Sequence, residues 1–125
     1  MKKILIIEDN DLNYLLVEEI LSDYNVEIIR ARDGKEFYSK IKRPVDYDLI
    51  LMDMMLPDTN GIALTKFLIR ENYDIPIIFM SASTDKYKEI SDLGIKNFIA
   101  KPFYQEVFIG NIRNYIELER LKECA

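Results

Sequence analysis

Four short apolar runs, each ending at a reactive side chain, constrain this 125-residue chain more than any other feature. The runs cover residues 3–7, 48–52, 75–80 and 97–100. The side chains that follow them are Glu8 with Asp9, Asp53, Ser81 and Lys101. Short apolar runs bounded by turn residues are typical of buried strands. Ligands bind beyond the carboxyl ends of strands in an open α/β sheet. The pattern therefore predicts one site that combines three carboxylates, a hydroxyl and an ammonium group.

Helical patterns alternate with these strands and with a further strand at residues 26–30. Helices are predicted over residues 11–24, from Asp33 to a stop at Pro44, after a cap at Asn60, over residues 84–93, and from Tyr104 onward. Gly94 is expected to cap the end of the fourth helix. In the first helix the residues expected to face inward are Leu12, Leu15, Leu16 and Ile20. In the last helix they are Phe108, Ile112, Tyr115 and Ile116.

Five strand-helix pairs predict an α/β fold with a parallel sheet covered by helices on both faces. The first, third and fourth strands are continuously apolar and should be central. The second strand carries Glu27 and Arg30, and the fifth is short, so these two should form the edges. This arrangement fits the doubly wound, flavodoxin-like (βα)5 fold with strand order 2-1-3-4-5. Its switch point lies between the first and third strands. One domain is expected to span residues 1–125.

Composition excludes several classes of function. The chain has no histidine, so it cannot supply a histidine base, metal ligand or phosphodonor. The single cysteine, Cys124, cannot form an internal disulfide, which favours a reducing compartment and a cytoplasmic location. A net charge of −5 without a basic stripe disfavours nucleic-acid binding by this chain alone. No apolar run approaches the roughly 20 residues of a membrane span. The first run meets Glu8 at once, so we interpret it as a strand, not a signal peptide.

The residues at the strand ends resemble those of the receiver domain of two-component response regulators over nearly the whole chain. The matching segments are Glu8-Asp9, Asp53 with Leu56-Pro57 and Gly61, Ser81-Ala82, and Lys101-Pro102-Phe103. The resemblance implies that Asp53 accepts a phosphoryl group from a phosphohistidine on a sensor histidine kinase or on a histidine phosphotransfer protein. Such a domain is a signalling phosphoacceptor in a phosphorelay. It catalyses only its own phosphorylation and dephosphorylation.

The resemblance also implies a Mg²⁺ site, with Mn²⁺ as a substitute. Asp9, Asp53 and the backbone carbonyl of Met55 would bind the metal directly, and Glu8 would act partly through water. Mg²⁺ is a hard cation that takes a few carboxylates and accepts phosphoryl oxygens. Three neighbouring carboxylates repel one another unless a cation neutralises them. The alternative, an N-cap cluster for the first helix, suits Asn10 or Asp11 better.

The remaining site residues are assigned roles by resemblance alone. Lys101 would pair with Asp53 and then with the phosphoryl group, and its bond to Pro102 would be cis. Ser81, followed by Ala82, would donate its hydroxyl to a phosphoryl oxygen while Phe98 turns inward. These movements would change the face formed by the fourth helix, fifth strand and fifth helix, which would bind a downstream protein. Ser81 as an ordinary residue before a helix, and Phe98 as core packing, remain open alternatives.

Three other functional interpretations remain. The chain is expected to be a stand-alone regulator, but it also fits a receiver module of a longer regulator with an effector domain. Residues 117–122 suit either a frayed helix end or the start of a linker. A Mg²⁺-dependent phosphatase with an aspartyl-phosphate intermediate usually carries a second Asp where this chain has Met55. A receiver that only binds partners is disfavoured by the complete set of acidic residues.

Overall fold

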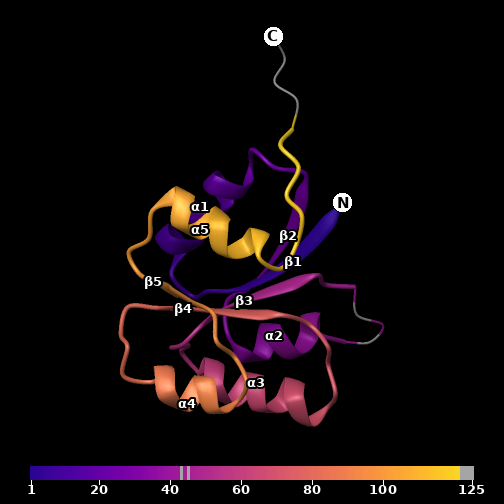
Figure 1. The fold of residues 1–125 in the computed structure, drawn as a ribbon. Helices are drawn as coiled ribbons and strands as arrows, with labels where there is room; N and C mark the ends of the chain where they lie inside the picture. The colour runs from indigo at the N-terminus through magenta and orange to yellow at the C-terminus, as the bar shows by residue number, and fades with distance from the viewer. Residues whose placement is uncertain (43, 45, 122–125) are drawn as a thin grey trace.

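Strands and helices alternate along the residues that the computed structural model describes, namely 1–42, 44 and 46–121 (Figure 1). The strands are β1 (Lys2–Ile7), β2 (Val26–Ala31), β3 (Leu49–Asp53), β4 (Ile77–Ser81) and β5 (Phe98–Ala100). The helices are α1 (Asp11–Leu21), α2 (Gly34–Lys40), α3 (Gly61–Arg70), α4 (Tyr87–Asp92) and α5 (Gln105–Arg113). Cys124 and Lys122 lie outside the described residues. Among the described helices, none has the length and apolar character needed to cross a membrane.

The five strands form one parallel sheet in the order β2-β1-β3-β4-β5, as the sequence predicted. The register of the neighbouring strands brings their carboxyl ends to nearly the same level. Ile7 lies opposite Met52, Asp53 opposite Met80, and Ser81 opposite Ala100. The residues at and just beyond these positions therefore meet along one edge of the sheet.

Two hydrophobic cores lie on opposite faces of the sheet because side chains alternate along each strand. In Figure 1, α1 and α5 cover one face, and α2, α3 and α4 cover the other. Ile4 and Ile6 point into the first core, where they join Phe108 and Ile112 of α5. Leu5 and Ile7 point into the second. The central strands are buried on both sides, which explains their continuous apolar sequence.

The predicted inner face of α1 is wrong. Leu12, Leu15 and Leu16 are exposed, whereas Val17, Ile20 and Leu21 are buried against the sheet. Apolar residues occupy more than one side of this helix, so periodicity alone did not select the buried side. Asn10 caps the helix by accepting a hydrogen bond from the backbone N–H of Asn13 at 2.9 Å. Of the four residues predicted to face inward, Ile20 alone is buried.

The chain after α5 is also different from the expected continuous helix. The helix ends at Arg113, residues 114–116 form a turn, and residues 117–121 continue without helical structure; we call residues 114–121 the C-terminal strap. The N–H of Asn25 donates to the carbonyl of Glu119 at 2.7 Å, and the N–H of Leu121 donates to the carbonyl of Asp23 at 2.9 Å. Leu118 is buried in the first core as a result. Residues 117–121 therefore do not continue α5 and are held against the domain, whereas the start of a linker stays a prediction.

One aromatic side chain fixes the C-terminal strap to the rest of the domain. Tyr24 is buried, and its ring lies 5.4 Å from the guanidinium of Arg113 and 5.6 Å from that of Arg120. Cations over aromatic faces are attracted by the ring quadrupole. Ile116, from the strap, packs into the same core as Tyr24. The two arginines therefore hold both ends of the strap near the start of β2.

Two glycines have opposite surroundings. A Cβ at Gly61, the first residue of α3, would lie 2.6 Å from the backbone oxygen of Asp53 and 2.7 Å from the ring of Phe79. A Cβ at Gly110, inside α5, would have no atom within 4 Å. Gly61 therefore allows α3 to start against the end of β3, whereas Gly110 only weakens its helix.

We predict that Gly61→Ala and Gly110→Ala shift stability in opposite directions. Gly61→Ala should lower the free energy of unfolding by about 1–3 kcal/mol, because the added methyl group overlaps backbone that cannot move away. Gly110→Ala should raise it by about 0.5–1 kcal/mol, because alanine is the better helix former. Urea titrations followed by circular dichroism measure both changes. A stabilising Gly61→Ala would contradict the close packing described above.

Candidate functional site

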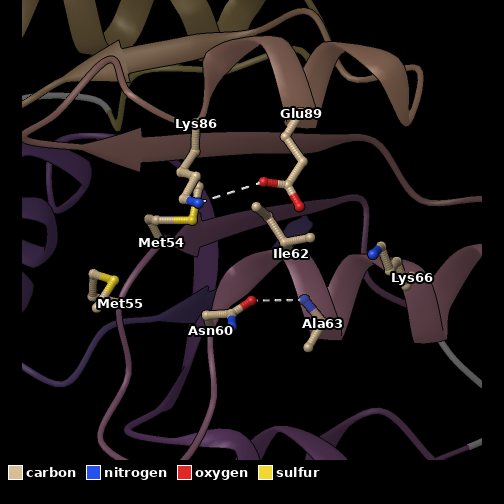
Figure 2. A pocket seen from close by; sticks show the side chains of 8 residues that line it. All are labelled: Met54, Met55, Asn60, Ile62, Ala63, Lys66, Lys86 and Glu89. Atoms are coloured by element: carbon tan, nitrogen blue, oxygen red, sulfur yellow. Dashed lines mark hydrogen bonds and ion pairs between the residues drawn. The ribbon is translucent and has the colours of Figure 1, made fainter.

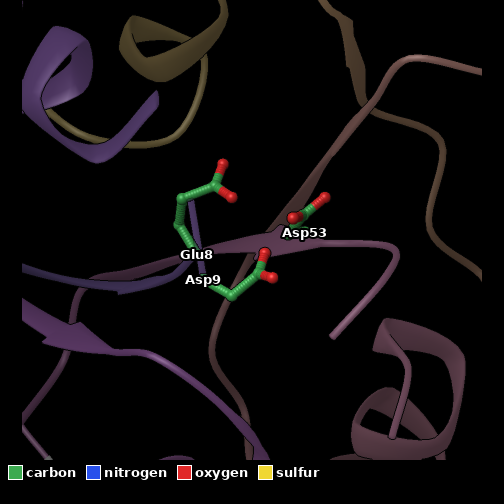
Figure 3. A group of neighbouring side chains, drawn as sticks. All are labelled: Glu8, Asp9 and Asp53. Carbon is green, nitrogen blue, oxygen red and sulfur yellow. The ribbon is translucent and has the colours of Figure 1, made fainter. Parts of the chain in front are cut away.

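Three carboxylates meet at the carboxyl edge of the sheet (Figure 3). Glu8 and Asp9 follow β1, and Asp53 is the last residue of β3. One oxygen from each carboxylate lies within 4.8 Å of the other two. Glu8 is 1% exposed and Asp53 8% exposed, whereas Asp9 is open to solvent. The sheet thus brings together the acidic residues that the sequence placed at two separate strand ends.

Lys101 joins this cluster from the residue after β5. Its Nζ atom lies 2.7 Å from Oε1 of Glu8 and 3.3 Å from Oδ1 of Asp53. The expected pairing with Asp53 is therefore present, but Glu8 is the closer partner. The lysine side chain is only 13% exposed, so these contacts are shielded from water. One ammonium group is shared between two largely buried carboxylates.

Charge crowding changes the acidity of Asp53. Burial, and after it the neighbouring Glu8, raises the pKa of Asp53 from 3.8 to about 7, while Lys101 acts in the opposite direction. Loss of hydration disfavours the charged form of a carboxyl group, and so does a second carboxylate nearby. The charged form of Asp53 is thus disfavoured in this cluster, and a further cation would favour it.

Glu8 is held by contacts that the sequence did not reveal. The Nε atom of Arg30, on β2, donates to the backbone carbonyl of Glu8 at 3.0 Å. The same guanidinium pairs with Asp11 at 2.9 Å and lies 4.5 Å from the ring of Tyr14. Arg30 was predicted only to mark an edge strand. An arginine inside the strand next to β1, near the acidic end of β1, was the available signal for a structural role.

Ser81 lies at the end of β4, and its hydroxyl is turned into its own loop. The Oγ atom donates to the carbonyl of Ser83 at 2.8 Å and accepts from the N–H of Ser83 at 3.1 Å. The backbone carbonyl of Ser81 accepts a hydrogen bond from the N–H of Lys101 at 2.8 Å. Ala82 follows within the same turn. Ser81 is therefore bonded to the strand end that carries the lysine, but its hydroxyl bonds elsewhere.

Phe98 lies at the start of β5 and contacts α4. Its ring stacks on that of Tyr87, with a centroid distance of 4.1 Å and an interplanar angle of 21°. It is partly buried and packs against the core on the side of α2, α3 and α4. Aromatic stacking thus connects β5 to a helix of only six residues.

The peptide bond between Lys101 and Pro102 is cis, as the resemblance implied.

The loop between β3 and α3 is tied to α2. The carboxylate of Asp58 accepts hydrogen bonds from the N–H groups of Gly34 at 2.8 Å and Lys35 at 3.1 Å. These groups belong to the free N-terminal turn of α2, where an anion is favoured. The N–H of Gly61 donates to the carbonyl of Met54 at 2.8 Å and closes the loop at its other end. Met55, whose side chain is 70% exposed, lies within this closed loop.

The cluster suits a hard divalent cation. Its ligands are carboxylate oxygens, which Mg²⁺ prefers, and it contains no nitrogen or sulfur ligand. Burial first, and Glu8 after it, raises the pKa of Asp53, so the charged form of this carboxyl group is disfavoured without a further cation. A divalent cation would relieve the repulsion between these carboxylates. Asp9, which is exposed, leaves one side of the cluster open to solvent.

Comparison with known proteins adds relatives over nearly the whole chain. The family model described as response regulator receiver domain matches residues 4–113. Response regulator ArlR of Staphylococcus saprophyticus is 37% identical over 115 residues, which cover 90% of this chain and 51% of ArlR. Polar-differentiation response regulator DivK of Brucella ovis is 36% identical over 119 residues, which cover 92% of this chain and 96% of DivK. The chain thus spans about half of ArlR and nearly all of DivK.

Solved structures share the fold. The receiver domain of a Francisella response regulator superposes with a TM-score of 0.82 at 28% identity and covers 92% of this chain and 96% of its own. The non-phosphorylated HemR receiver domain from Leptospira biflexa gives a TM-score of 0.79 at 28% identity. This match covers 98% of this chain and 100% of the HemR chain. Both neighbours are receiver domains.

We predict that Asp53→Asn raises the melting temperature in metal-free buffer. The pKa of Asp53 is higher in the folded than in the unfolded chain, so its contribution to stability is full below pH 3.8 and is lost as pH rises through about 7. Asparagine does not ionise, so the variant does not lose this stability as pH rises. The difference in melting temperature between the variant and the wild type should therefore grow over the same pH range. Thermal melts in EDTA at several pH values measure it.

The same melts with Mg²⁺ provide the control. Mg²⁺ should stabilise the wild type more than Asp53→Asn, because the variant lacks one carboxylate ligand. Equal shifts in both proteins would argue against a metal site that includes Asp53.

Proposed function

The chain belongs to the family of response regulator receiver domains of two-component signalling, and we propose that Asp53 is its phosphoacceptor. The donor is a phosphohistidine on a sensor histidine kinase or on a histidine phosphotransfer protein. One observation carries the proposal. Asp53 ends a buried strand within 3.3 Å of Lys101, beside two further carboxylates. A role as a helix cap or loop residue does not explain why an aspartate is buried beside a lysine and two other carboxylates.

The transfer needs an ionised Asp53 and a donor held in line with it. An oxygen of the Asp53 carboxylate forms a bond to phosphorus while the bond from phosphorus to the donor's imidazole nitrogen breaks. The electron pair of that bond stays on the imidazole. No separate base is needed, which agrees with a chain that has no histidine. Lys101 is placed to neutralise the phosphoryl oxygens, because transfer of this kind depends mainly on positioning and charge.

Mg²⁺ is the cofactor that the acidic cluster fits, with Mn²⁺ as a substitute. We assign Asp9, Asp53 and the backbone carbonyl of Met55 as its direct ligands, and Glu8 as a residue that acts partly through water. When bound, the ion supplies positive charge that offsets the carboxylates and accepts phosphoryl oxygens. Asp58 and the N–H of Gly61 hold the loop that carries Met55 in place.

Phosphorylation changes the charge of a crowded site, and we propose that Ser81 and Phe98 transmit the change. The phosphoryl group adds roughly 1.5 to 2 negative charges. The Ser81 hydroxyl leaves Ser83 and donates to a phosphoryl oxygen, and Phe98 leaves the ring of Tyr87 and turns inward. The face formed by α4, β5 and α5 then presents a different surface to a downstream protein. The domain acts in the cytoplasm as a switch that catalyses only its own phosphorylation and dephosphorylation.

Two arrangements of the whole protein agree with this role. Coverage of 96% of DivK supports a stand-alone regulator, and coverage of 51% of ArlR supports a module within a longer one. A phosphatase that works through an aspartyl phosphate is disfavoured, because Met55 occupies the position of its second aspartate. A receiver that only binds partners is disfavoured by the complete acidic cluster.

Exposed leucines on α1 offer a docking surface for the phosphodonor. Leu12, Leu15 and Leu16 are 78%, 53% and 41% exposed. The helix that carries them starts two residues after Asp9. Large apolar side chains grouped at the surface mark contact sites for other proteins. A donor protein bound to this helix would lie beside the acidic cluster.

We predict that acetyl phosphate with Mg²⁺ adds one phosphoryl group to the wild type and none to Asp53→Asn. Acetyl phosphate carries its own leaving group, so the reaction tests the site without a partner. Intact-mass spectrometry measures the product. EDTA should abolish labelling because it removes the cation. Labelling of the variant to the wild-type extent would rule out Asp53 as the acceptor.

We predict that Leu15→Glu slows phosphotransfer from a protein donor but not from acetyl phosphate. A charge in the centre of an apolar contact should lower the transfer rate at limiting donor by about tenfold or more. Ile69→Glu is the matched control, because Ile69 is similarly exposed but lies on α3, on the opposite face of the sheet. Equal loss in both variants, or slower acetyl phosphate labelling in Leu15→Glu, would contradict a docking role for α1.

A further inference from the structure

A groove runs between α3 and α4, beside the loop that follows Asp53 (Figure 2). Its volume is about 280 Å³. The residues that line it include Met54, Met55, Ile62, Lys66, Lys86 and Glu89. It lies on the side of α4 that faces α3, so it is separate from the surface between α4 and β5.

The floor of the groove is apolar and buried. Met54 and Ile62 are only 6% and 7% exposed, and both belong to the second hydrophobic core. Met55 lies at the rim with most of its side chain in solvent. A methionine side chain is flexible and adapts to different apolar partners. A large apolar side chain that enters the groove would therefore contact buried core side chains below and an adaptable side chain beside it.

Two ammonium groups border this floor from opposite walls. Lys66 projects from α3 and Lys86 from the start of α4 (Figure 2). The Nζ atom of Lys86 lies 3.7 Å from Oε2 of Glu89, and both side chains are about half exposed. An exposed pair of this kind contributes little to stability. A carboxylate from another molecule can therefore replace Glu89 at small cost.

We propose that this groove binds an acidic peptide segment of a partner protein, anchored by one large apolar side chain. A drug-sized ligand usually occupies roughly 300–1,000 Å³. The smaller groove suits one or two side chains better than a whole cofactor. The lysines on the two walls fit carboxylates on either side of the anchor. Binding rests on these lysines and the apolar floor, all of which are present in the unphosphorylated chain.

Selection from phage-displayed random peptides tests the proposal. The full chain, unphosphorylated and free of Mg²⁺, is the target, and the double variant Lys66→Glu/Lys86→Glu removes peptides that bind elsewhere. We expect enriched peptides with one large apolar residue flanked by Asp or Glu. The best peptide, synthesised and titrated by fluorescence anisotropy, should bind each single variant about tenfold or more weakly, and its affinity should fall with added salt.

Lys88→Glu is the matched control. Lys88 belongs to α4, pairs with Asp92 and is 91% exposed, and it does not border the groove. This variant should bind the peptide as the wild type does. Three outcomes would overturn the proposal. The enriched peptides could lack acidic residues, or no peptide could bind the wild type better than the double variant. The best peptide could also bind Lys66→Glu and Lys86→Glu as tightly as it binds the wild type. The single variants decide the test if the double variant does not fold. Acetyl phosphate labelling is independent of all these outcomes.

Discussion

Repulsion among three carboxylates, only partly relieved by one lysine, is the constraint around which the carboxyl edge of this domain is organised. Glu8 and Asp53 are almost fully buried, and a single ammonium group serves both. Buried charges that are incompletely paired destabilise the folded state. The site therefore holds an unfavourable interaction that cation binding would relieve, and the chain retains it at a cost in stability. The surrounding contacts make this arrangement possible.

Those contacts come from each neighbouring segment. Arg30 holds the backbone of Glu8 from β2, Asp58 ties the next loop to α2, and Gly61 lets α3 start against Asp53. Ser81 and Lys101 are joined through their backbones, although their side chains bond to different partners. The side chains around Asp53 thus come from separate strands, and the register of the sheet fixes their positions relative to one another. A change of charge or position at one strand end can therefore affect the other strand ends through the short, hydrogen-bonded loops between them.

Much of this arrangement was predictable because it follows from continuous apolar runs. Buried parallel strands need apolar residues on both faces, so their order and their ends are readable from composition. The convergence of Glu8, Asp53 and Lys101 follows from that order. The buried side of α1 was not predictable, because Leu15 and Leu16 satisfy helical periodicity as well as Val17 and Ile20 do. Arg30 and Asp58 act through backbone groups of distant segments, and no local pattern records such bonds.

The C-terminal strap has a consequence for where this domain ends. The family match stops at residue 113, which is also the last residue of α5. Ile116 and Leu118 nevertheless belong to the same core as β1, and the ring of Tyr24 contacts both Arg113, at the end of α5, and Arg120 of the strap. The folded unit is therefore longer than its family boundary. An expression boundary drawn at the end of the last helix would remove part of the hydrophobic interior and uncover the start of an edge strand.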